Sequence, residues 1–233
     1  MQKRWVKARG LSDTDRKTRV PGIIEKLRIA TQGMTEPAVT TIIKTYGRDP
    51  FLVLISCLLS LRTRDTVSLP ASLKLFDRAK TPLELLDLSI LNIEHLIYPV
   101  GFYRQKAKQI HHICNQLVQH FNGNVPDTEY DLLTLKGVGR KTANLVLGEG
   151  FGIPSICVDT HVHRISNRLN LVRTKTPAET EHALKKLLPK EYWIEYNRLL
   201  VMWGQNICVP ITPFCSICPI ADLCAKRGVK KNR

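Results

Sequence analysis

Four of the chain's seven cysteines stand close together near its carboxyl end, and this group limits the possible folds more than any other feature. They are Cys208, Cys215, Cys218 and Cys224, with the spacing C-x6-C-x2-C-x5-C. Four thiolates can surround a metal ion or an inorganic cluster tetrahedrally, and the C-x2-C pair supplies two of them from one tight turn. Zn²⁺ and a [4Fe–4S] cluster both satisfy such a set, and the alternative is a chance grouping of free thiols. The pattern predicts that this segment folds around a metal centre.

The other three cysteines, Cys57, Cys114 and Cys157, lie among apolar residues and are predicted to be small core residues. The chain begins with charged residues and lacks the apolar region of a secretory signal. A disulfide framework is therefore not expected. No apolar run reaches the roughly 20 residues that a membrane span requires, so no membrane association is expected either.

The net charge of the 233 residues is +15. This excess favours a polyanionic partner, nucleic acid first, although a basic protein without such a partner is the alternative. Residues 1–19 hold seven basic and two acidic residues, and residues 225–233 hold five basic residues and no acidic one. Both ends are expected to be mobile. The charge alone therefore does not define a binding site.

Apolar residues recur with helical spacing along most of the chain, and the alternating patterns typical of strands are scarce. Pro21 is interpreted as the start of the first helix, and Pro50 as the start of a buried helix that includes residues 51–61. Residues 103–121 form the longest amphipathic pattern. The sequence therefore predicts an all-α fold.

A turn of sequence Lys-Gly-Val-Gly at residues 136–139 separates two predicted helices. Glycines let backbone N–H groups point outward together, and the start of the following helix favours an anion. A phosphate of a nucleic-acid backbone fits this arrangement, although many helical hairpins contain such a turn without binding anything.

Lys141 falls in the first turn of the second of these helices. The helix dipole and partial burial would both disfavour its charged form there, and a neutral amine is a nucleophile that forms Schiff bases; an exposed, inert lysine is the simpler interpretation. Asp159 follows the apolar residues 156–158 and has two possible roles, a helix cap or a catalytic base.

Together these features resemble the endonuclease III family of helix-hairpin-helix DNA glycosylases. The resemblance rests on residues 135–147 (LKGVGRKTANLVL), residues 158–169 (VDTHVHRISNRL) and the cysteine spacing. Residues 98–107 (YPVGFYRQKA) and 58–65 (LLSLRTRD) support it. It extends over residues 22–224, nearly the whole chain.

The resemblance implies a two-domain fold with a DNA cleft between the domains. A six-helix barrel at residues 43–153 would contain the helix-hairpin-helix near 129–147. Residues 22–42 and 154–224 would form a discontinuous domain that holds a [4Fe–4S] cluster on the four cysteines. Residues 1–21 would be a flexible basic extension, and residues 225–233 a basic tail.

The resemblance also implies a bifunctional DNA glycosylase and AP lyase of base excision repair, which removes oxidised pyrimidines and cleaves the abasic site by β-elimination. Lys141 aligns with the family's nucleophile and Asp159 with its carboxylate. The hairpin residues Gly137, Val138, Gly139 and Arg140 would hold a backbone phosphate. The expected partner is duplex DNA with a damaged pyrimidine or an abasic site, bound by a monomer. The expected location is the cytoplasm, with the nucleoid, in a bacterium, and the nucleus or mitochondrion in a eukaryote.

Two positions depart from the common bacterial pattern. Arg62 stands where the family usually carries Gln, a residue that enters the gap left by the flipped base, and Phe102 stands where many members have Leu as a wedge. Neutral variation is the alternative interpretation of both. A mismatch-specific adenine or thymine glycosylase is a competing function, but such enzymes generally lack a lysine at the Lys141 position. A non-catalytic DNA-binding scaffold would have no use for Lys141 together with Asp159.

Overall fold

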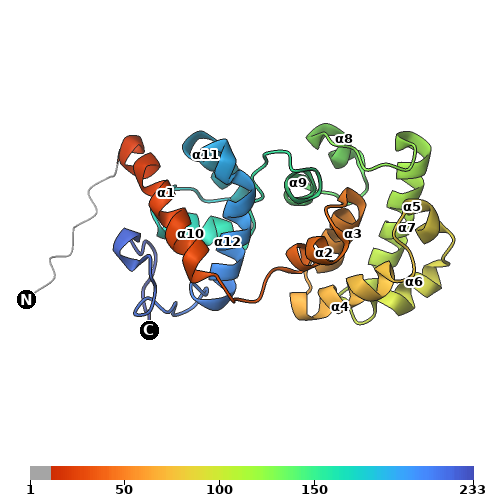
Figure 1. Ribbon diagram of the computed structural model, residues 1–233, viewed down its shortest axis with the longest axis horizontal. Coiled ribbons are helices and arrows are strands. Elements are labelled where there is room, and N and C mark those ends of the chain that lie inside the picture. Colours follow the sequence, from red (N-terminus) through yellow and green to blue (C-terminus); the bar gives the residue numbers. More distant parts are fainter. Residues whose placement is uncertain (1–11) are drawn as a thin grey trace, which may run out of the picture. The chain divides into compact units, whose positions relative to one another are not determined.

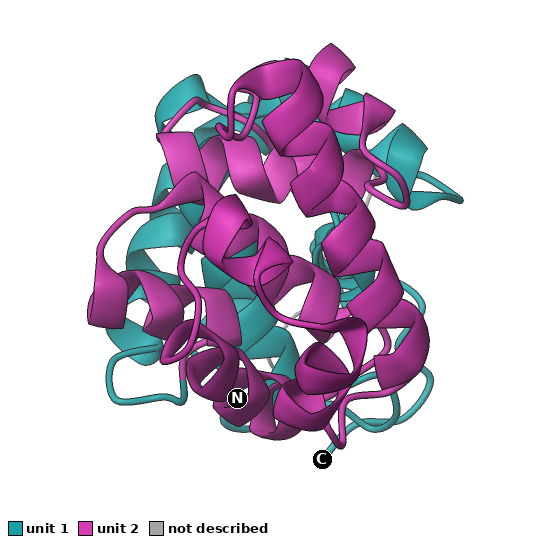
Figure 2. Ribbon diagram, turned by 90° about the vertical axis from the view of Figure 1, so that its right-hand side faces the viewer, with its two compact units in different colours: residues 1–35, 158–233 teal, residues 36–157 magenta. Residues whose placement is uncertain are grey.

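The structure is a computed structural model that describes residues 12–233, and within that range it contains helices and no strands. The all-α prediction is confirmed. Two compact units divide the chain: unit 1 comprises Val158–Arg233 together with the described part of Met1–Thr35, and unit 2 comprises Glu36–Cys157. Figure 1 labels the helices, and Figure 2 colours the two units. No helix in the described part of the chain is long and apolar enough to cross a bilayer.

Unit 2 is a bundle built around one largely apolar and buried helix, α3. Asp49 caps this helix by accepting hydrogen bonds from the N–H groups of Phe51 and Leu52, and Pro50 occupies its first turn, as the sequence predicted. Nine of its residues are buried, and it packs against α2, α4, α7, α9 and η1. The helices of unit 2 are α2 (Ala38–Tyr46), α3 (Pro50–Ser60), α4 (Asp65–Phe76), α5 (Pro82–Leu86), α6 (Ile90–Ile97), α7 (Tyr103–Phe121), α8 (Glu129–Thr134), α9 (Arg140–Leu145) and the π-helical η1 (Val146–Phe151).

The predicted domain boundary between residues 42 and 43 falls inside α2. Because α2 packs against α3 and α4, it belongs wholly to unit 2. Residues 154–157 also belong to unit 2, since Ser155 donates a hydrogen bond to the carbonyl of Asn144 at 2.5 Å. The chain thus passes between the units at 35–36 and at 157–158.

Unit 1 joins the first described helix to residues 158–233. The long helix α1 packs against α11 and α12, and α10 packs against both α11 and α12. The helices of unit 1 are α1 (Asp13–Ala30), α10 (Thr160–Arg168), α11 (Pro177–Leu187), the 3-10 turn η2 (Lys190–Tyr192), α12 (Trp193–Asn206) and the 3-10 turn η3 (Ala221–Leu223).

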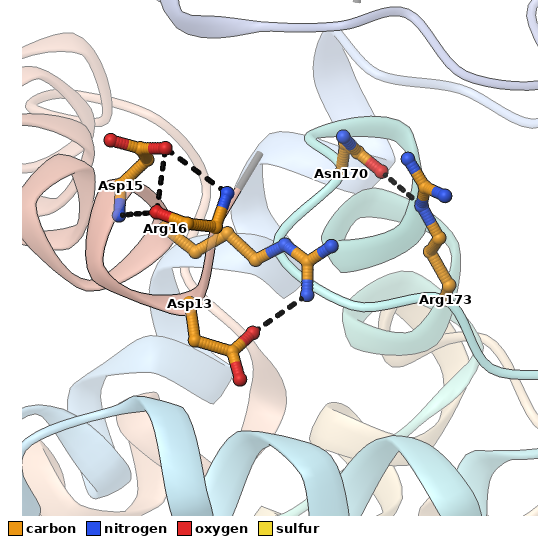
Figure 3. A network of polar contacts seen from close by, with 6 residues as sticks. Asp13, Asp15, Arg16, Asn170 and Arg173 are labelled. Carbon is orange, nitrogen blue, oxygen red and sulfur yellow. Dashed lines mark hydrogen bonds and ion pairs between the residues drawn. The ribbon is translucent and has the colours of Figure 1, made fainter. Parts of the chain in front are cut away.

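Helix α1 begins eight residues before the proline at which the sequence predicted its start. Ser12 accepts a hydrogen bond from the Asp15 N–H, and the Asp15 carboxylate accepts one from the Ser12 N–H, which is a capping box. Arg16 is paired with Asp13 at 3.0 Å, and nearby Arg173 donates to Asn170 at 3.0 Å (Figure 3). Residues 13–21 are therefore helical rather than a flexible extension. The rest of that predicted extension, residues 1–11, lies outside the described residues.

The basic segment at residues 225–233 is packed against unit 1 rather than mobile. The Arg227 N–H donates to the carbonyl of Arg168 at 3.1 Å, and the Arg233 N–H donates to the carbonyl of Pro213 at 3.0 Å. The Arg233 guanidinium lies over the Phe214 ring, 4.1 Å from its centroid. Backbone hydrogen bonds and a cation–π contact thus hold the backbone of this segment and the Arg233 side chain against the rest of unit 1.

Candidate functional site

The turn between α8 and α9 is braced by the long helix α7. Gln109 donates to the carbonyl of Lys136 at 3.0 Å, and the Lys136 N–H donates to the side chain of Gln116 at 3.0 Å. Gly137 has φ +79°, a backbone angle that favours glycine, and the Gln109 amide packs closely against it. The Val138 N–H donates to the carbonyl of Leu135, and the Val138 side chain is buried. The turn is therefore held in place by its hydrogen bonds to α7 and by its buried valine.

Helix α9 begins directly after this turn. Gly139 is its N-cap and supplies no side-chain hydrogen bond to the helix, while Arg140 is paired with Glu129 at 3.6 Å. Lys141 is exposed, whereas the following residues Thr142, Ala143 and Asn144 are buried. The partial burial of Lys141 expected from the sequence is not found. Its backbone is fixed by buried neighbours, and its side chain projects from a rigid helix start.

Two buried cysteines, Cys157 and Cys57, lie near Lys141. The Cys157 thiol donates to the Lys141 carbonyl at 3.5 Å. Burial raises the pKa of Cys57 to about 12, against the opposing effect of the Lys141 charge. Both thiols are core groups, as the sequence predicted for them, and Cys114 is buried as well.

Asp159 stands in unit 1 as the N-cap of α10. Its Oδ1 accepts a hydrogen bond from the Val162 N–H at 2.8 Å, so the carboxylate caps this helix. Of the two roles that the sequence allowed for Asp159, the structure shows the helix cap. Capping does not exclude the catalytic role. Lys141 belongs to unit 2 and Asp159 to unit 1.

The four clustered cysteines line one cavity in unit 1, together with apolar side chains that include Trp203 and Val229. No group of three His, Cys, Asp or Glu residues in the described range 12–233 is arranged to hold a single metal ion. Four thiols on one cavity are a donor set that suits Zn²⁺ or a [4Fe–4S] cluster.

A buried arginine gives this cavity a positive charge. Arg168 on α10 is 8% exposed and donates to Cys208 Sγ at 3.3 Å and to the carbonyls of Val209 at 2.7 Å and Pro210 at 2.6 Å. A buried guanidinium is costly unless negative charge lies near it. Burial raises the pKa of Cys224 to about 11, so this thiol is protonated at neutral pH until a metal displaces its proton. Arg168 therefore suits a cavity filled by thiolates and their metal.

Arg62 and Phe102 come from separate parts of unit 2 and lie against each other. Both have left-handed backbone angles, φ 55° and φ 60°, which bulky residues rarely adopt. The Arg62 guanidinium lies 5.6 Å from the centroid of the Phe102 ring, and both side chains are exposed. The sequence identified each of them but did not predict that they touch.

Sequence reasoning missed Lys106 and Arg168, which are both buried. Each carried a signal, because each falls on the apolar face of its helix. Lys106 is four residues before Ile110, and Arg168 is three residues after Ile165. A charged residue on the buried side of a helix indicates a specific set of partners.

Comparison with protein families matches residues 55–190 to the HhH-GPD superfamily of base excision DNA repair proteins. The chain is 49% identical over 196 residues to endonuclease III of Thermotoga maritima, a match that covers 82% of the chain and 92% of that relative.

Two solved structures share the fold. The structure of a non-covalent endonuclease III–DNA complex matches with a TM-score of 0.79 and 32% identity, over 90% of the chain and 95% of that structure. A trapped endonuclease III–DNA covalent intermediate with an estranged adenine matches with a TM-score of 0.78 and 32% identity, over 90% of the chain and 96% of that structure.

Proposed function

Because the chain belongs to the HhH-GPD superfamily of base excision DNA repair proteins, we propose that it is a bifunctional DNA glycosylase and AP lyase. It removes oxidised pyrimidines from duplex DNA and then cleaves the strand at the abasic site. The observation that carries this proposal is Lys141, an exposed amine at the start of a rigid helix, directly after a glycine turn. The similarity to a trapped covalent complex of endonuclease III with DNA supports it.

In the proposed reaction the damaged nucleotide is flipped out of the duplex, because its sugar C1′ cannot be reached inside the stack. The Lys141 amine attacks C1′, and the bond from C1′ to the base breaks as the base leaves. The amine then loses a proton and the C1′–O4′ bond of the sugar opens, with O4′ taking up a proton, which gives a Schiff base between Lys141 and C1′. The Schiff base makes the C2′ proton acidic, and its removal expels the 3′ phosphate by β-elimination.

Asp159 is the proposed carboxylate partner of this reaction. A carboxylate can accept a proton from the attacking amine and stabilise the positive charge that develops on the sugar. Because Asp159 is held as the N-cap of α10 by its bond to Val162, its side chain is already oriented before DNA binds.

The turn of Gly137, Val138 and Gly139, with Arg140 beside it, is the proposed site for a backbone phosphate. The start of α9 has no side-chain cap, so its N–H groups suit an anionic ligand. Such a contact fixes the register of the protein on DNA without reading sequence. Arg62 and Phe102 are proposed to enter the duplex where the flipped nucleotide has left a gap.

We propose that Cys208, Cys215, Cys218 and Cys224 hold a [4Fe–4S] cluster. The buried Arg168 beside Cys208 supports an anionic thiolate-bound group in this cavity, and the similarity to endonuclease III favours the cluster over a single zinc ion. When bound, the cluster would serve a structural role by joining four points of the segment that follows α12. A protein purified without air that is colourless and contains zinc would contradict this assignment.

We further propose that the protein acts as a monomer on duplex DNA that carries a damaged pyrimidine or an abasic site. It would then work where the cell keeps its DNA, which is the cytoplasm of a bacterium or the nucleus or mitochondrion of a eukaryote.

Borohydride trapping tests the proposed nucleophile, because borohydride reduces a Schiff base to a stable crosslink. The wild type is expected to become crosslinked to a duplex that contains thymine glycol, whereas Lys141→Ala is not. Lys136→Ala is the matched control, since it removes an exposed lysine five residues away, and it is expected to crosslink like the wild type. If the wild type formed neither a crosslink nor a nick, the protein would not be a bifunctional enzyme. A crosslink that persists in Lys141→Ala would assign the nucleophile to another amine.

A further inference from the structure

Lys106 lies in the first turn of α7 and is only 6% exposed. An ammonium group is costly to bury, and lysine is among the residue types least often found fully inside a protein. Burial lowers the pKa of Lys106 to about 8, so the ammonium form still predominates at neutral pH. A charge that is kept at a buried position requires hydrogen-bond acceptors close to it.

The partners of Lys106 are three oxygen atoms where α3 ends. Its Nζ donates to the carbonyls of Leu59 at 2.8 Å and Leu61 at 2.6 Å, and to the Thr63 hydroxyl at 3.1 Å. The last carbonyls of a helix have no partner within the helix, and a cation near them is favoured by the helix dipole. Lys106, which belongs to α7, therefore caps the carboxyl end of α3.

Thr63 extends this connection to the turn that precedes α7. The Gly101 N–H donates to the Thr63 hydroxyl oxygen at 3.2 Å, and the same hydroxyl lies 3.3 Å from the Leu61 carbonyl. The Lys106 ammonium group and the Thr63 hydroxyl group thus join residues 61–63 to the turn before α7. The two segments are about 40 positions apart in the chain.

Each of the two joined segments presents one exposed residue in a strained conformation. Arg62 and Phe102 both have positive φ angles, and the Arg62 guanidinium lies 5.6 Å from the Phe102 ring centroid. Such backbone angles persist only when the surrounding structure determines them, and they gather at functional sites. The contacts of Lys106 and Thr63 involve the residues on both sides of Arg62 and the residue that precedes Phe102.

We propose that Lys106 is a positioning residue, which holds the end of α3 against the start of α7 so that Arg62 and Phe102 act on DNA as one rigid unit. This inference rests on the proposed function, which assigns the two exposed residues to the gap in the duplex. It predicts that the positioning matters for duplex DNA, where a gap has to be filled, and not for single-stranded DNA, where no base lies opposite.

The central test replaces Lys106 by methionine, which keeps the length of the side chain and removes its charge and its donors. Lys106→Met is expected to lower kcat/KM on a thymine glycol duplex roughly 10- to 100-fold, because small displacements of positioning groups have effects of that order. The rate of borohydride trapping on single-stranded abasic DNA is expected to stay within about twofold of the wild type, since the Lys141 segment is untouched. Lys108→Met, which removes an exposed lysine of the same helix, is the matched control and should change neither value.

A double-variant comparison shows whether Lys106 acts through Arg62. If it does, Lys106→Met combined with Arg62→Ala loses no more duplex activity than Arg62→Ala alone. If the two losses multiply instead, or if Lys106→Met lowers the duplex and single-strand rates equally, Lys106 is merely structural and the proposal is overturned.

Trypsin provides a readout that does not depend on enzymatic activity. Cleavage after Arg62 or Arg64 is expected to be slow in the wild type and in Lys108→Met, and faster in Lys106→Met, because the turn is no longer held. Equal cleavage rates in all three proteins would overturn the positioning role. A wild type inactive on both substrates, with cleavage faster only in Lys106→Met, would overturn the proposed function while leaving the positioning of this turn supported.

Discussion

At the scale of single residues, two lysines of unit 2 show how position decides what an ammonium group does. Lys106 is buried and donates to three oxygen atoms, so its charge is used to fix two turns. Lys141 is exposed on a helix whose next three residues are buried, so its amine can meet a substrate while its backbone stays fixed. The same functional group supports the structure at one position and is available for chemistry at the other.

Asp159 allows capping and catalysis to be separated, because asparagine caps a helix about as well as aspartate. Asp159→Asn is expected to keep the thermal stability of the wild type and to lose ~10²- to 10⁴-fold in glycosylase turnover, the usual contribution of a general acid–base group. Asp159→Ala is expected to lose the activity and also about 1 kcal/mol of stability, since the bond to the Val162 N–H is gone. Single-turnover kinetics and thermal unfolding measure the two effects. Normal turnover in Asp159→Asn would show that this carboxylate caps α10 and has no catalytic role.

At the scale of elements, helix α9, which bears Lys141, continues into a π-helical turn, η1. The helical turns run to Phe151, and Gly152 ends them with φ +73°. Glycine is needed here because η1 approaches α3 closely: a Cβ on Gly150 would lie 2.9 Å from the Pro50 Cα. The position of α9 therefore depends on a contact between two backbones.

Gly150→Ala is expected to destabilise the protein by ~1–3 kcal/mol, because the added methyl group meets backbone that cannot move aside. Gly22→Ala in α1 is the matched control: its Cβ would meet only Leu223 Cδ1, at an ordinary 3.9 Å. Alanine favours a helix by about 0.5–1 kcal/mol over glycine, so this control should be more stable than the wild type. Urea unfolding followed by circular dichroism measures both. The same sign of change in the two variants would contradict the close approach of η1 and α3.

At the scale of the whole molecule, the two units are built from the chain in different ways. Unit 2 is one continuous segment, and its apolar core is formed by residues between Val39 and Leu147. Unit 1 joins α1 to helices that follow Val158, so neither of its two segments has the complete set of packing partners. Lys141 is in the continuous unit, and Asp159 and the four clustered cysteines are in the discontinuous one.

A fragment of residues 36–157 is therefore expected to fold alone. It should show helical circular dichroism and one cooperative thermal transition, since it retains its whole core. It should bind no iron and turn over no lesion, because it lacks the clustered cysteines and Asp159. A matched fragment of residues 158–233, which lacks α1, should remain unfolded. If the 36–157 fragment showed no cooperative transition, unit 2 would depend on unit 1 for its stability.

Local patterns predicted the helices well, because periodicity and caps act within a few positions. Residues 103–121 were predicted as one helix, and α7 has those bounds. The start of α1 was predicted incorrectly because Pro21 outweighed the capping box of Ser12 and Asp15, although the box is visible in the sequence. The contact of Arg62 with Phe102 was not predictable, since it depends on packing between segments about 40 positions apart.

The discontinuity of unit 1 sets the order in which a newly made chain can assemble. Helix α1 is synthesised first, yet its partners α11 and α12 follow only after all of unit 2. At about 5–20 residues per second, roughly 9 to 35 seconds pass between the synthesis of α1 and that of its last partner helix. Unit 2, with Lys141 on its surface, can finish folding within that interval. The segment with the four clustered cysteines is then the last part to fold, so the metal centre proposed there would form last.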